Sequence, residues 1–143
     1  MPENKLIKVI IDTNLWISFL IGKELANLKD LIVDRTIQPV ISEQLLEELI
    51  LVTQRPKLQK YFSLDKVNDL IQFLKIIGFE IEIKSEVTIC RDAKDNYLLA
   101  IAKDSKANFL ITGDQDLLIL KIFEDTEILT YSNFLLKINQ PFN

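Results

Sequence analysis

The feature that most constrains the fold is the alternation of short apolar runs with amphipathic segments along a chain of 143 residues. The runs with the length and composition of strands cover residues 7–11, 39–41, 109–112 and 127–130. The segments with helical periodicity cover residues 25–33, 43–53, 65–77, 94–103, 115–123 and 132–137. This order predicts an α/β fold in which helices lie on both faces of a central, mainly parallel sheet, a three-layer α/β/α arrangement. Residues 80–83 alternate glutamate with isoleucine, which favours a short edge strand.

The length fits one compact domain over residues 1–143. Composition then narrows the chemistry, because the chain contains no histidine. Ser-His and Cys-His nucleophiles, histidine bases and imidazole-ligated zinc are therefore excluded, and catalysis depends on carboxylates or lysine. The formal net charge of −4 gives no general attraction for nucleic acid, so such a partner requires metal ions or a local basic patch.

The cellular setting follows from what the sequence lacks. The single cysteine, Cys90, has no internal disulfide partner, and we expect a small buried or half-buried thiol. No secretion signal opens the chain, and the longest apolar runs, such as residues 49–52, are too short to cross a bilayer. We therefore expect a cytoplasmic protein that does not span the membrane.

Acidic residues stand where several of these elements begin or end. Asp12 directly follows the first strand, in the stretch VIIDTN. Glu48 lies in the helix predicted over residues 43–53, where it borders the buried stripe formed by Leu45, Leu46, Leu49, Ile50 and Val52. Each acid also has a structural interpretation, as a helix cap in the case of Asp12 and as a side chain at the rim of the apolar stripe in the case of Glu48.

Asp95 is the most unusual of the acids. In the stretch RDAKDNYLLAIAKD it shares the i, i+3, i+4, i+7 positions with Leu98, Leu99 and Ala102, so it falls on the apolar stripe of its helix. A carboxylate there requires a cation, hydrogen-bond donors or a metal. In the alternative interpretation, Asp92 caps this helix and Asp95 interacts with the positive end of its dipole.

A second strand-end acid follows residues 109–112. In FLITGDQDLL, Asp114 is the expected cap of the next helix and Asp116 lies in its first turn. Parallel strands place Asp12 and Asp114 at the same edge of the sheet, and the helices containing Glu48 and Asp95 begin at that edge. Gathered carboxylates repel one another unless a cation joins them, and Mg²⁺ or Mn²⁺ prefers such oxygen ligands. An ion of this kind supports phosphodiester hydrolysis without histidine.

These residues resemble the motifs of the PIN-domain family, and in particular its bacterial toxin branch, the VapC-like ribonucleases. The matching stretches are VIIDTNLWIS, SEQLLEELILVTQRPKL, CRDAKDNYLLAIA and ANFLITGDQDLL. The resemblance implies that Asp12, Glu48, Asp95 and Asp114 hold one or two Mg²⁺ or Mn²⁺ ions and that Asp116 assists. It assigns Thr13, Asn14 and Thr112 to holding the carboxylates and water in place, with Asp92 sharing or replacing part of the role of Asp95.

The same resemblance implies cleavage of single-stranded RNA by a toxin that a cognate antitoxin restrains, with a homodimer possible in this branch. Cations that could contact RNA are Arg55, Lys57 and Lys60 beside Tyr61, together with Arg91 and Lys94. For each of them taken singly, an ordinary solvated face is the slightly preferred interpretation. The amphipathic segment around Val67 to Ile77 is interpreted as core, and so are Trp16, Phe19 and Leu20.

Two other functions remain open on the sequence. One is an inactive PIN fold that binds protein or RNA. The other is a phosphotransfer domain with an aspartate nucleophile at a strand end, which the sequence favours less. Haloacid-dehalogenase-type enzymes carry a second aspartate two residues after the first, where this chain has Asn14, and receiver-type domains require paired acids and a strand-end lysine that are not evident.

Overall fold

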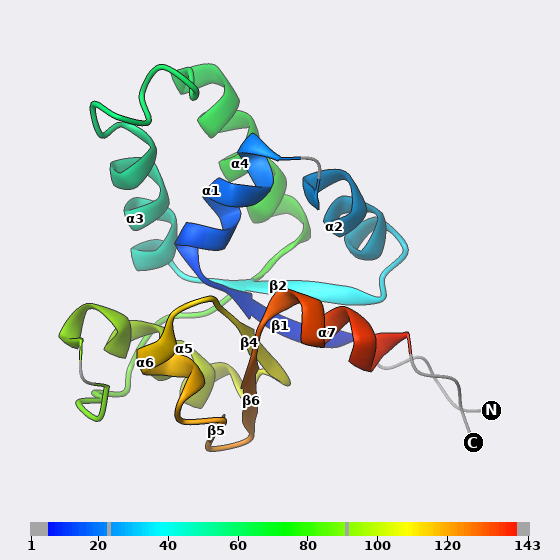
Figure 1. Ribbon diagram of the computed structural model, residues 1–143, viewed down its shortest axis with the longest axis vertical. Coiled ribbons are helices and arrows are strands. Elements are labelled where there is room, and N and C mark those ends of the chain that lie inside the picture. Colours follow the sequence, from blue (N-terminus) through cyan, green and yellow to red (C-terminus); the bar gives the residue numbers. More distant parts are fainter. Residues whose placement is uncertain (1–5, 23, 91, 140–143) are drawn as a thin grey trace.

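The computed structural model describes residues 6–22, 24–90 and 92–139, and within them the chain forms one six-stranded sheet with helices on both faces (Figure 1). The strands are β1 (Ile7–Ile11), β2 (Ile37–Ile41), β3 (Phe79–Glu80), β4 (Phe109–Ile111), β5 (Ile122–Phe123) and β6 (Thr126–Leu129). The helices are α1 (Thr13–Ile21), α2 (Glu24–Val33), α3 (Glu43–Thr53), α4 (Leu64–Ile77), α5 (Asn96–Ser105), α6 (Gln115–Leu118) and α7 (Tyr131–Ile138), with a 3₁₀ turn, η1, at Ala93–Asp95.

The sheet is mainly parallel, as predicted. Its strand order is β3-β2-β1-β4-β6-β5, and β5 alone among these strands runs antiparallel to its neighbour. Helices α1 to α4 lie on one side of the sheet, whereas α5 and α6 lie on the other (Figure 1). Helix α7 joins the α1 side, since the rings of Tyr131 and Phe19 lie 4.9 Å apart. The prediction of a three-layer α/β/α fold is confirmed.

The centre of the sheet places the first acid. Residues Val9, Ile10 and Ile11 of β1 pair with Phe109, Leu110 and Ile111 of β4, and the side chains of Val9 to Ile11 are at most 1% exposed. From β1 the chain proceeds through β2 toward one edge, whereas from β4 it proceeds through β6 toward the other. The carboxyl ends of β1 and β4 therefore form the topological switch point, where open α/β sheets have a crevice.

Helix α1 was not predicted from the sequence. Its segment, TNLWISFLI, is apolar nearly all round, so it lacks the polar face that marks an amphipathic helix. Trp16 and Phe19 are 1% and 3% exposed, which confirms their interpretation as core residues. The absence of a connecting loop means that Asp12 is at once the residue after β1 and the N-cap of α1.

Three other local predictions were wrong. The helix predicted over residues 115–123 ends at Leu118, because Lys121 adopts a left-handed conformation (φ 63°) and the next two residues pair with β6 as β5. The strand predicted over residues 80–83 covers Phe79–Glu80 instead, and beyond it the carboxylate of Asp104 accepts hydrogen bonds from the backbone N–H groups of Lys84 and Ser85 at 2.7 and 2.9 Å. Ile50 was predicted to be buried and is 36% exposed.

No helix within the described ranges is long and apolar enough to cross a membrane.

Candidate active site

Asp12 is a buried carboxylate at the carboxyl end of β1. It is 5% exposed, and its backbone N–H donates to the carbonyl of Ile111 at 3.1 Å, so β1–β4 pairing continues through it. Asp12 Oδ1 accepts from the backbone N–H of Asn14 at 3.2 Å and from Thr13 Oγ1 at 3.5 Å. Asp12 thus caps α1, but an exposed cap would serve that purpose, so its burial requires a further explanation.

Thr112 connects the two strand ends. Its hydroxyl donates to Asp12 Oδ2 at 2.8 Å and accepts from the backbone N–H of Asp114 at 3.0 Å. Thr112 is fully buried, so this contact is shielded from water. Asp114 in turn caps α6 by accepting from the backbone N–H of Asp116 at 2.8 Å. The strand-end acids are therefore held by one hydrogen-bonded network that passes through Thr112.

The third motif contributes Asp95 from the other helical layer. The sequence predicted a helix from residue 94, whereas a 3₁₀ turn precedes α5 and Asp95 stands at the N-cap position without making a side-chain cap. The side chain is half-buried, and its Oδ2 atom is buried with no hydrogen-bond donor. Asp92 is exposed and caps the 3₁₀ turn by accepting from the backbone N–H of Lys94 at 3.1 Å.

Burial, a hydrogen bond with the Asp114 carboxylate and the charges of Asp114, Asp12 and Asp92 together raise the pKa of Asp95 from 3.8 to about 7, with burial the largest cause. In this hydrogen bond the protonated Asp95 carboxyl donates to Asp114. Asp95, Asp114 and Asp12 are consequently close enough to disfavour one another's charge, and an added cation would relieve this repulsion.

Tyr97 is a member of this cluster that the sequence analysis missed. Its half-buried ring packs against the core. Burial raises the pKa of Tyr97 well above its ordinary range, a hydrogen bond with the Thr13 side chain lowers it in part, and the charges of Asp12, Glu48 and Asp95 raise it. The phenol therefore stays protonated at neutral pH. The charge of half-buried Glu48 also acts on Tyr97, so Glu48 lies at the margin of the cluster. Glu47 is exposed, as predicted.

Cys90 and Asp116 lie on the α6 side of the cluster. The Cys90 side chain is 6% exposed, as predicted, and its Sγ lies 3.9 Å from the carbonyl oxygen of Asp116. Burial raises the pKa of Cys90, a hydrogen bond from the Asp92 backbone lowers it, and the charges of Asp95, Asp114 and Asp116 raise it. The sulfur therefore remains a thiol at neutral pH, which is a poor metal ligand.

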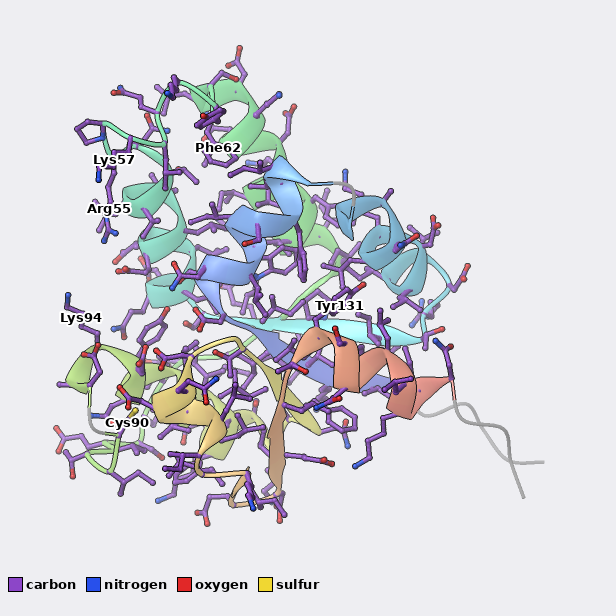
Figure 2. All side chains as sticks on the ribbon, viewed as in Figure 1. Arg55, Lys57, Phe62, Cys90, Lys94 and Tyr131 are labelled. Carbon is purple, nitrogen blue, oxygen red and sulfur yellow. The ribbon has the colours of Figure 1, made fainter. Side chains whose placement is uncertain are left out.

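The predicted RNA-contacting cations lie outside this cluster. Arg55, Lys57 and Lys60 are exposed in the turn after α3, and the Lys60 ammonium lies 5.1 Å from the centre of the Tyr61 ring. Lys94 is exposed on η1, and it lies on the same side of the molecule in Figure 2 as Arg55 and Lys57. Arg91 lies outside the described residues.

The donor set is suited to a hard divalent cation. It consists of carboxylate and hydroxyl oxygens, and the buried Oδ2 of Asp95 has an unused lone pair where a cation would offset its desolvation. Across the described ranges, no group of three or more acidic or cysteine side chains forms a ready-made metal site.

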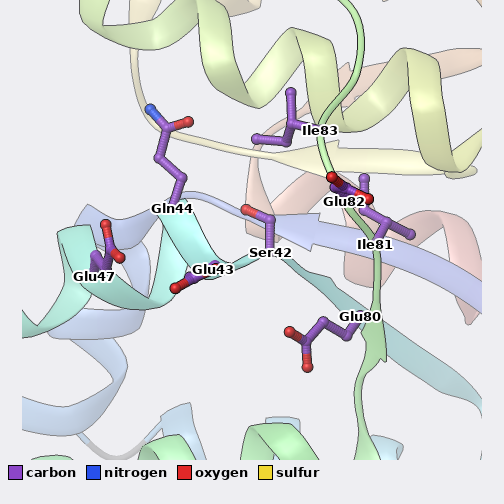
Figure 3. A pocket seen from close by; sticks show the side chains of 8 residues that line it. All are labelled: Ser42, Glu43, Gln44, Glu47, Glu80, Ile81, Glu82 and Ile83. Carbon is purple, nitrogen blue, oxygen red and sulfur yellow. The ribbon is translucent and has the colours of Figure 1, made fainter.

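A second acidic region lies away from this cluster. It is a cavity of about 680 Å³ lined by Ser42, Glu43, Gln44, Glu47, Glu80, Ile81, Glu82 and Ile83, at the beginning of α3 and beside β3 (Figure 3). Its four glutamates are exposed, and the Ser42 hydroxyl accepts the cap hydrogen bond from Leu45 N at 3.1 Å. These acids are solvated, so size alone does not make this cavity the functional site.

Comparison with known proteins identifies a family. The family model described as PIN domain matches residues 8–116, which include every acid of the cluster. The chain is 33% identical over 138 residues to Uncharacterized protein MJ1680 of Methanocaldococcus jannaschii, covering 94% of this chain and 87% of the relative.

A solved structure supports the same fold. The chain resembles the PIN domain of human SMG5 with a TM-score of 0.52 and 13% sequence identity, covering 92% of this chain and 99% of that one. PIN domains are typically nucleases that use divalent metal ions. With a family match over most of its length and a PIN-like arrangement of strands and helices, this chain belongs to the PIN-domain family.

Proposed function

We propose that the protein is a metal-dependent endoribonuclease that hydrolyses phosphodiester bonds of single-stranded RNA. The observation that carries the proposal is the meeting of Asp12, Asp95 and Asp114 at the β1–β4 switch point, with a buried Asp95 oxygen that has no donor. An acid cluster used only for helix capping would expose its carboxylates to water, as Asp92 does.

In the proposed reaction, Asp12, Asp95 and Asp114 hold Mg²⁺ or Mn²⁺, and Glu48 and Asp116 assist from the margin. The bound ion supplies Lewis-acid stabilisation of the phosphate charge and lowers the pKa of an attacking water. Thr112 and Thr13 donate to the two oxygens of Asp12, which would hold this carboxylate in one orientation for binding the ion.

The substrate approaches from the side that bears Arg55, Lys57, Lys60 and Lys94 in this proposal. These exposed cations can pair with phosphates, and Tyr61, which is 52% exposed, offers a ring on which a base can stack. Single-stranded RNA suits such a surface better than duplex RNA, since unpaired bases are free to stack.

The cleavage proposal is tested with purified protein, single-stranded RNA and Mn²⁺. We expect cleavage that EDTA abolishes and that is absent from Asp12→Asn and from Asp95→Asn. Equal cleavage by wild type and both variants would identify a contaminating nuclease. RNA binding without cleavage by the wild type would instead favour an inactive PIN-fold binding module.

We further propose that the protein is the cytoplasmic toxin of a toxin-antitoxin pair, able to form a homodimer. The resemblance of its four motifs to the VapC-like branch supports this role. Expression of the wild type, but not of Asp12→Asn, should arrest growth, and co-expression of a small DNA-binding protein encoded by the adjacent gene should restore it. Unimpaired growth under the active wild type would contradict the toxin role, and sedimentation velocity measures the oligomeric state.

A further inference from the structure

The turn that carries Asp95 is closed by a hydrogen bond from a side chain. The amide oxygen of Asn96, Oδ1, accepts from the backbone N–H of Cys90 at 2.8 Å. Within this closure, the backbone N–H of Asp95 donates to the carbonyl of Asp92 at 3.0 Å, and that of Lys94 donates to Asp92 Oδ1 at 3.1 Å. The bonds to Asp92 shape the turn internally, whereas the bond from Asn96 ties it to the buried chain at Cys90.

The same closure connects the turn to α6. Cys90 is 6% exposed, and its thiol donates to the carbonyl oxygen of Asp116 at 3.9 Å. Asp116 lies in the first turn of α6, whose N-cap is Asp114. Asn96 therefore links the turn of Asp95 to the beginning of α6 through one buried residue, and these contacts help to set how the two acidic motifs lie relative to each other.

The carboxylate of Asp95 takes no part in this closure. Two other acids of the cluster, Asp12 and Asp114, each use a side-chain oxygen to cap a helix. Asp95 stands at the N-cap position of α5 without making such a bond, and its buried Oδ2 has no donor. The side chain of Asn96 supplies the closure instead, so the Asp95 carboxylate remains available to a cation.

We propose that Asn96 is a positioning residue for the metal site, which ties the turn of Asp95 to Cys90 and so keeps the Asp95 carboxylate within the cluster. This inference rests on the proposed function, because the placement of Asp95 matters to the reaction only if Asp95 holds an ion. Residues that orient metal ligands typically change metal affinity by about 10- to 100-fold when they are removed. A bond that only stabilised the fold would have no such effect.

Asn108 offers a matched bond away from the site. Its Oδ1 accepts from the backbone N–H of Lys8 at 2.9 Å, so it too is an asparagine side chain that holds a backbone donor. Asn108 directly precedes β4, whereas Asp114 lies beyond the other end of this strand. Asn96→Ala and Asn108→Ala therefore remove the same kind of bond, one beside the acids and one far from them.

The experiment measures Mn²⁺ binding to the full chain by electron paramagnetic resonance in the absence of RNA. We expect Asn96→Ala to weaken Mn²⁺ binding about tenfold and Asn108→Ala to bind as the wild type does. Asn96→Asp keeps the acceptor and adds a negative charge, so it should bind Mn²⁺ at least as tightly as the wild type. If Asn96→Ala fails to fold, Asn96→Leu, which has a similar shape without the acceptor, takes its place.

Amide hydrogen exchange reports on the bond itself. The Cys90 amide proton should exchange faster in Asn96→Ala than in the wild type, whereas Asn96→Asp should keep its protection. A cleavage assay adds a readout at the reaction. Asn96→Ala should lose activity at limiting Mn²⁺ and regain it at saturating Mn²⁺, because this variant retains every carboxylate of the cluster.

The possible failures are distinguishable. Wild-type Mn²⁺ affinity in Asn96→Ala, an equal loss in Asn108→Ala, or a comparable loss in Asn96→Asp would overturn the role of Asn96 alone. Unchanged exchange of the Cys90 amide in Asn96→Ala would overturn it as well, since the bond would then not hold the turn. Absence of Mn²⁺ binding by the wild type would instead overturn the proposed metal-dependent function, and the role of Asn96 with it.

Discussion

The two acidic regions of this molecule show that burial, rather than the number of acids, distinguishes a reactive site. The glutamate-lined cavity beside β3 contains Glu43, Glu47, Glu80 and Glu82, all exposed to water. The cluster at the ends of β1 and β4 contains Asp12 at 5% exposure and a raised pKa at Asp95. A carboxylate that stays in water loses little solvation free energy on folding and needs no partner. A buried carboxylate loses much of this solvation and requires a counter-charge to stay ionised.

The largest expected difference between the regions is catalytic. Asp12→Asn should reduce RNA cleavage by roughly 10³-fold, because loss of an ionic ligand removes several kcal/mol of transition-state stabilisation. Glu82→Gln in the glutamate-lined cavity should leave the rate unchanged. Initial rates on one single-stranded RNA, at fixed Mn²⁺, provide the comparison. A large loss of cleavage rate in Glu82→Gln, with Asp12→Asn still active, would show that the glutamate-lined cavity is the active site instead.

The backbones leading to the two regions should also respond differently. A Cβ at Gly78, just before β3, would lie 2.5 Å from the carbonyl oxygen of Leu74 and 3.2 Å from that of Pro39. Gly78→Ala should therefore cost about 2 kcal/mol in the free energy of unfolding. A Cβ at Gly113, beside Asp114, meets nothing within 4 Å, so Gly113→Ala should change stability by less than about 0.5 kcal/mol. Urea titration measures the free energy of unfolding of both variants. Equal losses of stability would contradict the difference in free space around the two glycines.

The cations should affect RNA affinity rather than chemistry. We expect the combined Arg55→Ala and Lys57→Ala variant to raise KM for RNA by about tenfold at unchanged kcat, since exposed charges contribute about 1 kcal/mol or less each. The dependence of log affinity on log salt should become shallower by about 0.7 for each RNA phosphate that these side chains no longer neutralise. Lys75→Ala, an exposed lysine in the last turn of α4, is the matched control. An unchanged salt dependence of RNA affinity in the double variant would show that RNA does not contact Arg55 and Lys57.

The smallest expected effect concerns pH and stability without metal. Because the pKa of Asp95 rises from 3.8 to about 7 on folding, the folded state binds more protons between these values. Its stability therefore falls as pH rises through that window, and the full cost remains above pH 7. After allowance for solvent screening, Asp95→Asn should gain about 1 kcal/mol, or about 3 °C in Tm, at pH 8 and little at pH 4. A gain independent of pH would show that Asp95 ionisation is not responsible.

The sequence predicted the parts of the fold in which apolar and polar residues alternate with a clear period. Helix α3 matches its predicted bounds, and α5 keeps Leu98 and Leu99 on the buried stripe. Helix α1 was missed because its residues are apolar on nearly every side, so no period separates helix from buried strand. The end of α6 depends on the left-handed backbone at Lys121, for which the sequence gives no glycine or asparagine signal.

Candidate site residues at strand ends were accessible from sequence, whereas Tyr97 was not. In a continuous helix, residues two apart point in different directions, so Tyr97 was not associated with Asp95. The 3₁₀ turn at Ala93–Asp95 changes this geometry and allows both side chains to face the same cluster. Asn14 shows the opposite discrepancy, because its backbone N–H contacts Asp12 while its side chain is exposed.

The hydrogen bond from Asp12 N to the carbonyl of Ile111 makes the central acid part of the most protected pair of strands. We expect its amide proton to exchange with solvent only when the whole chain unfolds. Distorting the acid's backbone would then require nearly the full free energy of unfolding, which few binding events supply. An inhibitory protein would therefore silence such a site by blocking its entrance, and release of the inhibitor would restore activity without a refolding step.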